Sequence, residues 1–122
     1  MTSDTAPSRR AILVVDDDIS LLDALERAFH EAGENVVARG SFEEGRIALR
    51  ERSFDVLITD IRLGAFNGLQ LAVLARDLWP DIKLIVFSGF DDAVLKAEAD
   101  KVGATYLVKP VSSATLLELV RG

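Results

Sequence analysis

Five short apolar segments alternate with longer amphipathic ones along this chain of 122 residues. The apolar segments are rich in Val, Ile and Leu, and they lack the regular alternation of a strand with one face in water. This pattern is typical of strands that are covered on both faces, as they are in a parallel sheet. We therefore expect strands at residues 11–15, 35–38, 55–59, 82–87 and 105–108.

The segments between these strands have helical periodicity. In the first of them, Leu22, Leu25 and Phe29 are spaced to line one face of a helix. Ser20 and Asp23 have the spacing of a capping box at the start of this helix. Asp18 is expected to be a cap or a solvated residue rather than a metal ligand. The chain thus contains five strand-and-helix units, and we expect the last two helices at residues 91–102 and 112–121.

Strands and helices that alternate in this way predict an open α/β sheet with helices on both faces. Ligand sites in such sheets lie beyond the carboxyl ends of the strands, where the strand order reverses. Four strand ends carry polar residues: Asp16, Asp17 and Asp18 after the first, Asp60 at the third, Ser88 at the fourth and Lys109 at the fifth.

These side chains have a chemistry in common. The carboxylates of Asp16, Asp17 and Asp60 would repel one another at one edge of the sheet unless a cation neutralised them. Oxygen ligands without His or Cys suit Mg²⁺, which keeps several of its waters. Lys109 adds a positive charge and Ser88 a hydroxyl, a pair that could hold a phosphoryl group delivered to one of the carboxylates.

Composition narrows the range of partners. The chain has 20 acidic and 14 basic residues, a net charge of -6, and no cluster of basic and aromatic residues, so we expect neither nucleic acid nor a membrane surface as a partner. The absence of cysteine excludes disulfides and agrees with a cytoplasmic location. We expect residues 1–10 to be a disordered lead-in and residues 11–122 to form one domain.

Four motifs in order, VVDDD, LITDIRLGAFNG, VFSG and YLVKP, resemble those of the response-regulator receiver domain of two-component signalling. The resemblance covers residues 11–121. It implies a flavodoxin-like (βα)5 doubly wound five-stranded parallel sheet with strand order 2-1-3-4-5. It also implies a regulatory phosphoacceptor rather than an enzyme, although such a domain takes part in its own phosphorylation and dephosphorylation.

The resemblance implies a role for each residue of the site. Asp60 would be the phosphoacceptor, and Asp16, Asp17 and Asp60 would hold Mg²⁺ together with the backbone carbonyl of Arg62. Lys109 would pair with the phosphoryl oxygens. The bond between Lys109 and Pro110 would be cis, which directs the lysine toward Asp60.

The resemblance also implies an output. Ser88 would be the switch hydroxyl, and Tyr106 the aromatic residue whose rotamer follows it. Phosphorylation would then change the surface formed by the fourth helix, the fifth strand and the fifth helix. The implied partners are a histidine kinase or phosphotransfer protein, an output domain or effector protein, and a second copy in a phosphorylation-dependent homodimer.

Three residues depart from the usual family pattern. Gly64 and Ala65 stand where the family often has Pro and then Gly, so we expect a looser loop at residues 61–67. Gly89 follows the switch hydroxyl and leaves the pocket open to solvent. Arg62 and Phe90 then become the side chains that we expect to restrict access of water.

The alternative function is a phosphatase of the haloacid-dehalogenase type. That class also begins with an apolar strand followed by Asp-x-Asp, a spacing that Asp16 and Asp18 match, and Asp16 would be the nucleophile. Its later acidic pair fits poorly, because Asp91 and Asp92 fall on the expected fourth helix. The position of the phosphate distinguishes the two functions.

His30 has no partner in the pattern, and we expect it to be exposed and structural.

Overall fold

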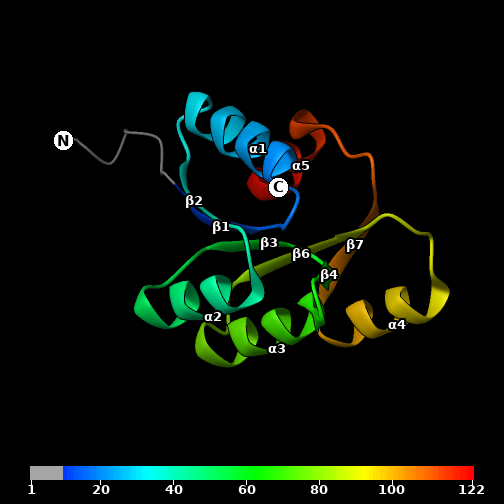
Figure 1. Cartoon of the computed structure of the whole chain (residues 1–122). Coiled ribbons are helices and arrows are strands. Elements are labelled where there is room, and N and C mark those ends of the chain that lie inside the picture. The colour runs from blue at the N-terminus through cyan, green and yellow to red at the C-terminus, as the bar shows by residue number, and fades with distance from the viewer. Residues whose placement is uncertain (1–9) are drawn as a thin grey trace.

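A five-stranded parallel sheet forms the centre of the computed structural model, which describes residues 10–122 (Figure 1). The strand order is β2-β1-β3-β6-β7, which confirms the predicted order 2-1-3-4-5 because β6 and β7 are the fourth and fifth strands of this sheet. The predicted strand ends agree with the structure to within one residue. The strands are β1 (Ala11–Val15), β2 (Asn35–Arg39), β3 (Val56–Asp60), β6 (Lys83–Ser88) and β7 (Ala104–Val108).

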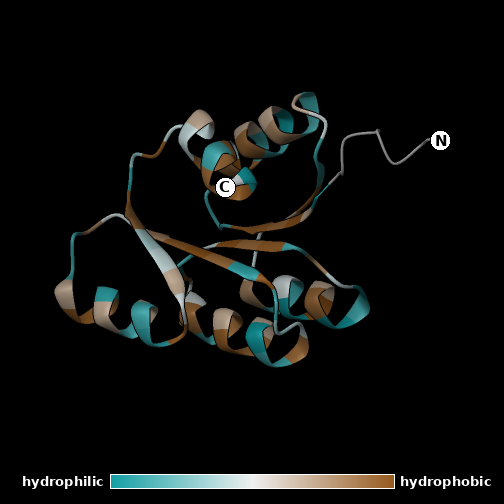
Figure 2. Cartoon of the chain, turned by 180° about the vertical axis from the view of Figure 1, so that it is seen from behind, coloured by the Kyte–Doolittle hydropathy of each residue, from teal (hydrophilic) through white to brown (hydrophobic). Residues whose placement is uncertain are grey.

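Helices cover both faces of the sheet (Figure 1). One face carries α1 (Ile19–Glu31) and α5 (Ser113–Arg121). The other carries α2 (Phe42–Glu51), α3 (Gly68–Leu78) and α4 (Ala93–Lys101). The strands are apolar along most of their length, as Figure 2 shows, and two hydrophobic clusters fill the spaces between the sheet and the two helical layers.

The first helix begins earlier than predicted. Its N-cap is Asp18, whose side chain accepts a hydrogen bond from the N–H of Leu21, and the helix itself starts at Ile19. The predicted capping box at Ser20 and Asp23 is therefore wrong. Aspartate is as good an N-cap as serine, and Asp18 lies closer to the end of β1, so the helix starts as soon as the strand is over.

The segment after β3 is a hairpin where a loose loop was expected. β4 (Arg62–Leu63) pairs antiparallel with β5 (Phe66–Asn67), and Gly64 and Ala65 form the turn between them. Gly68 follows at the start of α3, where an added Cβ would lie 1.9 Å from the carbonyl oxygen of Asp60. Only glycine allows this close return of the chain to the end of β3.

The described residues include no helix that is long and apolar enough to cross a membrane. The expected lead-in lies outside the described residues, apart from Arg10. The backbone N–H of Arg10 donates to the buried carboxylate of Glu34, which also binds Arg121 at the end of α5.

Candidate functional site

The sheet register brings the predicted site residues to one edge. Val15 of β1 pairs with Thr59 of β3, so Asp16 and Asp60 follow side by side. Asp60 in turn pairs with Phe87 of β6, and Ser88 pairs with Val108, the residue before Lys109. Parallel strands in this register place their carboxyl ends together, as the sequence predicted.

The three carboxylates form a cluster at this edge. One oxygen from each of Asp16, Asp17 and Asp60 lies within 4.8 Å of the others. Asp16 is fully buried and Asp60 is 7% exposed, whereas Asp17 is exposed. Three converging carboxylates with one open side match the oxygen ligands and the retained waters that Mg²⁺ requires. The residues present therefore fit the predicted cation.

Lys109 connects two of the carboxylates. Its Nζ atom lies 3.1 Å from Oδ2 of Asp16 and 3.1 Å from Oδ2 of Asp60, and 4.8 Å from the centre of the Phe87 ring. Burial alone would lower the pKa of Lys109, but the hydrogen bond and the negative charge of Asp16, together with Asp60, raise this pKa overall. Lys109 is thus a cation held at the acidic cluster.

Burial has the opposite consequence for Asp16. Removal from water raises the pKa of the Asp16 carboxyl, although the N–H of Asp18 and the ammonium of Lys109 both act to lower it. The net direction is upward. A buried carboxylate of this kind is stabilised by a nearby positive charge, whether a lysine or a metal ion.

A backbone N–H holds each carboxylate of the cluster. Asp16 accepts from the N–H of Asp18 at 2.9 Å, and Asp60 from the N–H of Arg62 at 3.3 Å. Asp17 accepts from the N–H of Gly64 at 3.2 Å. These three N–H donors could not be predicted from the sequence. Every residue except proline has a backbone N–H, so such a donor has no sequence signature.

Ser88 lies at the end of β6 and is 2% exposed. Its Oγ accepts the N–H of Phe90, and the hydroxyl of Tyr106 donates to the carbonyl of Phe90 and accepts the N–H of Asp92. The two expected switch residues are therefore joined through the segment between β6 and α4. Tyr106 is half-buried and packs against one of the hydrophobic clusters.

Arg62 and Phe90, the side chains expected to restrict access of water, are in contact with each other. The guanidinium of Arg62 lies 5.2 Å from the centre of the Phe90 ring, in the range of a cation–π contact. An added Cβ at Gly89 would meet nothing within 4 Å, so the space next to Ser88 at this position is open. The peptide bond between Lys109 and Pro110 is cis, as predicted.

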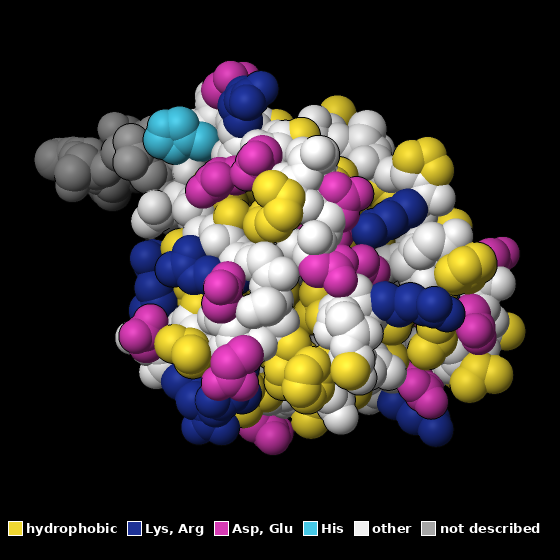
Figure 3. Space-filling model, in the orientation of Figure 1, with side chains coloured by type: hydrophobic (Ala, Val, Ile, Leu, Met, Phe, Trp, Pro, Cys, Tyr) yellow, Lys and Arg dark blue, Asp and Glu magenta, His cyan; other side chains and the backbone are white. Residues whose placement is uncertain are grey.

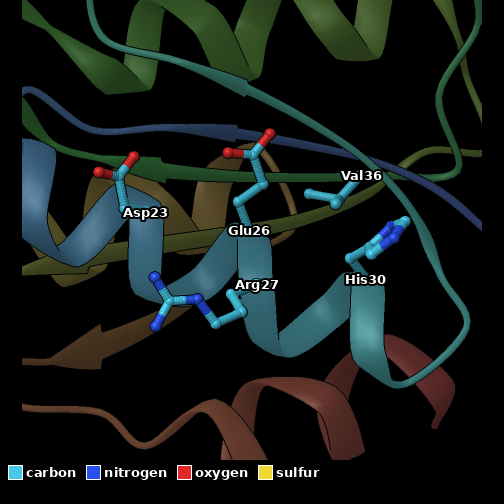
Figure 4. A pocket seen from close by; sticks show the side chains of 5 residues that line it. All are labelled: Asp23, Glu26, Arg27, His30 and Val36. Atoms are coloured by element: carbon cyan, nitrogen blue, oxygen red, sulfur yellow. The ribbon is translucent and has the colours of Figure 1, made fainter.

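A cavity of about 420 Å³ lies elsewhere, on the surface of α1 (Figure 4). Its lining residues are Asp23, Glu26, Arg27, His30 and Val36, none of which belongs to the acidic cluster. His30 is exposed, as expected. The side of the molecule seen in Figure 3 carries acidic and basic side chains intermixed, without a continuous basic surface.

A doubly wound parallel sheet with three carboxylates and a lysine at its carboxyl edge defines a flavodoxin-like domain with an acidic site that could hold a metal ion. The family model of the response regulator receiver domain matches residues 12–121. The chain therefore belongs to the response regulator receiver domain family.

Individual relatives agree with this assignment. The transcriptional regulatory protein ZraR of Salmonella typhimurium is 32% identical over 108 residues, which are 88% of this chain and 24% of ZraR. A CheY-like receiver domain protein from Methanospirillum hungatei has a TM-score of 0.88 and 30% identity, with 93% of this chain and 92% of that one covered. The chain spans about a quarter of the length of ZraR.

A third similar structure is a response regulator from Burkholderia pseudomallei with a phosphorylated aspartic acid, a calcium ion and citrate. Its TM-score is 0.85 at 28% identity, with 91% of this chain and 66% of that chain covered. Membership of the family makes this chain a two-component phosphoacceptor switch. The alternative of a haloacid-dehalogenase-type phosphatase is rejected, and Asp18, its second aspartate, is the N-cap of α1.

Proposed function

We propose that Asp60 is the residue that accepts the phosphoryl group. A carboxylate oxygen of Asp60 attacks the phosphorus of a phosphohistidine, the P–N bond breaks, and the electron pair leaves with the imidazole. The product is an acyl phosphate on Asp60. The position of Asp60 supports this role, because it ends the central strand β3 and keeps 7% of its surface exposed beside Lys109 and two further carboxylates.

The carboxylates of Asp16, Asp17 and Asp60 and the carbonyl of Arg62 would hold Mg²⁺, which when bound supplies positive charge between the donor phosphate and the acceptor. The donor set supports this assignment, since all three carboxylates converge within 4.8 Å. The carbonyl of Arg62 stays a prediction from the family resemblance. Without a bound cation, Lys109 is the positive charge that contacts this cluster.

Lys109 and Ser88 would hold the oxygens of the new phosphoryl group. Lys109 already contacts Asp60 at 3.1 Å, so its ammonium needs only a small movement to pair with an oxygen attached there. Arg62 and Phe90 would shield the acyl phosphate from water, which is supported by the contact between their side chains. The rate of hydrolysis then depends on both side chains.

The output would follow from the bonds around Phe90. A phosphoryl group adds a charge of about -1.5 to -2 and attracts the Ser88 hydroxyl. Movement of Ser88 toward it breaks the hydrogen bond from the N–H of Phe90, whose carbonyl is the acceptor for Tyr106. The Phe90 segment that holds the Tyr106 hydroxyl is then free to move, so Tyr106 can change its rotamer and the surface of α4, β7 and α5 changes. The proposal also includes the partners of the domain. The phosphoryl donor would be a histidine kinase or phosphotransfer protein, and an effector or output domain would bind the changed surface. We also propose phosphorylation-dependent homodimerisation and a cytoplasmic location.

Intact-mass spectrometry after incubation with acetyl phosphate and Mg²⁺ tests the proposal. The unmodified chain and Asp18→Asn should each gain one phosphoryl group, because Asn also caps a helix and Asp18 is outside the site. Asp60→Asn should gain none. Stoichiometric phosphorylation of Asp60→Asn would contradict the assignment.

A further inference from the structure

The three carboxylates of the cluster are not held in the same way. Asp16 and Asp60 each accept the N–H of the residue two positions later, so the local chain that carries the carboxylate also fixes it. Asp17 instead accepts the N–H of Gly64, which lies 47 residues away in the β4–β5 hairpin. Asp17 is also the exposed member of the cluster. Its orientation therefore depends on a separate element of the structure.

The turn of this hairpin gives Gly64 a special backbone conformation. Arg62 pairs with Asn67 and Leu63 with Phe66, which leaves a two-residue turn. Gly64 has a φ of +61°, and Ala65 is not among the residues with positive φ. A positive φ at the first turn residue alone is the pattern of a type II′ turn, which favours glycine or asparagine there.

The space around Gly64 shows that conformation, and not crowding, restricts this position. A Cβ added at Gly64 would meet nothing within 4 Å. An alanine there would fit but would disfavour the positive φ, whereas asparagine tolerates it. A proline would remove the N–H that Asp17 accepts and would also impose a negative φ.

An aromatic contact also packs the same hairpin against α2. The ring of Phe66 stacks on that of Phe42, with ring centres 4.7 Å apart and planes 13° from parallel. Phe66 is nevertheless 54% exposed, so its main support is this stacking rather than burial in the core. A cavity of about 280 Å³ between the hairpin and α2 is lined by both rings, by Asp17 and by Gly64.

We propose that the β4–β5 hairpin positions Asp17 for the metal ion, with Gly64 as the positioning residue and the Phe42–Phe66 stack as its support. The inference rests on the proposed function, in which Asp17 is a ligand of Mg²⁺. The N–H of Gly64 donates a hydrogen bond to Oδ2 of Asp17 and so restricts rotation of the carboxylate. The other carboxylate oxygen would then be available to the metal or its water. Partners of this kind, bonded to a metal ligand, contribute about 10-fold to 100-fold to metal affinity.

Titration calorimetry with Mg²⁺ alone, at one neutral pH, tests the inference. The family often has Pro followed by Gly here, but in this chain Ala65 follows, so Gly64→Pro both removes the donor to Asp17 and disrupts the turn. Gly64→Pro should therefore weaken Mg²⁺ binding by about 10-fold or more. Gly64→Asn keeps the N–H and tolerates the turn, so its affinity should stay within about twofold of the unmodified chain. Ile47→Ala, at an exposed position of α2 outside this cavity, should also leave the affinity unchanged.

Thermal unfolding of each variant separates a local from a global effect. Where Gly64→Pro does not fold, Gly64→Ala and Phe66→Ala replace it: both keep the N–H but disturb the turn or its support, and both should weaken binding while Gly64→Asn does not. Equal affinity of the unmodified chain and these variants would overturn the positioning role alone. Failure of the unmodified chain to bind Mg²⁺ would overturn the proposed metal site and the inference with it.

Discussion

Removal of the Lys109 ammonium tests how the acidic cluster is stabilised without a metal ion. Lys109→Met keeps a long apolar side chain against the ring of Phe87 but leaves Asp16 and Asp60 without their shared cation. Asp16 is fully buried, so its carboxylate would then lack both water and a counter-charge. We expect the folded state of this variant to be less stable at neutral pH in the absence of Mg²⁺.

The size of the effect follows from the two ion pairs. At 3.1 Å and an effective dielectric constant of about 20, each pair attracts by about 5 kcal/mol before any cost is subtracted. Burying the ammonium opposes this gain, and the Lys109 side chain is still 24% exposed, so solvent screens both pairs. We expect a net loss of about 2 kcal/mol in the free energy of unfolding, below the loss of about 3 to 5 kcal/mol that is typical of fully buried pairs, because Lys109 is partly exposed.

The pH dependence has a defined sign. Lys109, with its raised pKa, stays protonated in the folded and unfolded chain from acidic to neutral pH, and its stabilisation is lost only as pH rises through that raised value. Burial raises the pKa of Asp16, and loss of the ammonium removes a lowering influence. The Asp16 carboxyl of the variant therefore takes up a proton more readily than in the unfolded chain. The stability deficit should be largest at neutral pH and shrink as pH falls through the raised pKa of Asp16.

Urea unfolding without Mg²⁺ measures this deficit. With a slope of about 1 to 2 kcal/mol per molar urea, a loss of about 2 kcal/mol lowers the midpoint by about 1 to 2 M. Lys101→Met, at an exposed lysine of α4, is the matched control and should change the midpoint little. Unfolding of Lys109→Met at the same urea concentration as this control, or a deficit that grows on acidification, would show that Lys109 does not stabilise the cluster in this way.

Three further predictions concern the switch residues, the contact between Arg62 and Phe90, and the N-cap of the first helix. With beryllofluoride and Mg²⁺, the amide chemical shifts outside the site should change most on α4, β7 and α5, and Ser88→Ala should weaken this response. Changes on α1 and α2 instead would show that phosphorylation alters a different surface. Phe90→Ala removes the ring beneath the Arg62 guanidinium, so the acyl phosphate should hydrolyse severalfold faster, as measured by loss of phosphoprotein with time. Asp18→Ala should lower stability by about 1 kcal/mol in urea unfolding because the N-cap is lost, whereas Asp18→Asn should not.

The sequence predicted the sheet and the cluster because both depend on strong, regular signals. Strands buried on two faces have continuous apolar sequences, and parallel strands bring their carboxyl ends to one edge, so Asp16, Asp60 and Lys109 could be placed together before the fold was known. Asp18 and Ser20 were both candidates for the N-cap of α1, because both residue types cap helices, and only the observed end of β1 selects Asp18.

The β4–β5 hairpin could not be predicted in the same way. Each of its strands has two residues, too few for any periodicity. The stacking of Phe66 on Phe42 joins residues far apart in the sequence, and the N–H of Gly64 has no side-chain signature. Glycine at position 64 suggested a looser loop, but the structure shows that its positive φ forms a defined turn.

Chemical trapping of the phosphorylated residue identifies directly which aspartate accepts the phosphoryl group. Borohydride reduces an aspartyl phosphate to homoserine, so peptide sequencing by mass spectrometry after phosphorylation with Mg²⁺ and acetyl phosphate locates the acceptor. We expect homoserine at position 60 of the unmodified chain. In Asp60→Asn, we expect no aspartate to be converted to homoserine. Homoserine at Asp16 or Asp17, with Asp60 intact, would contradict it.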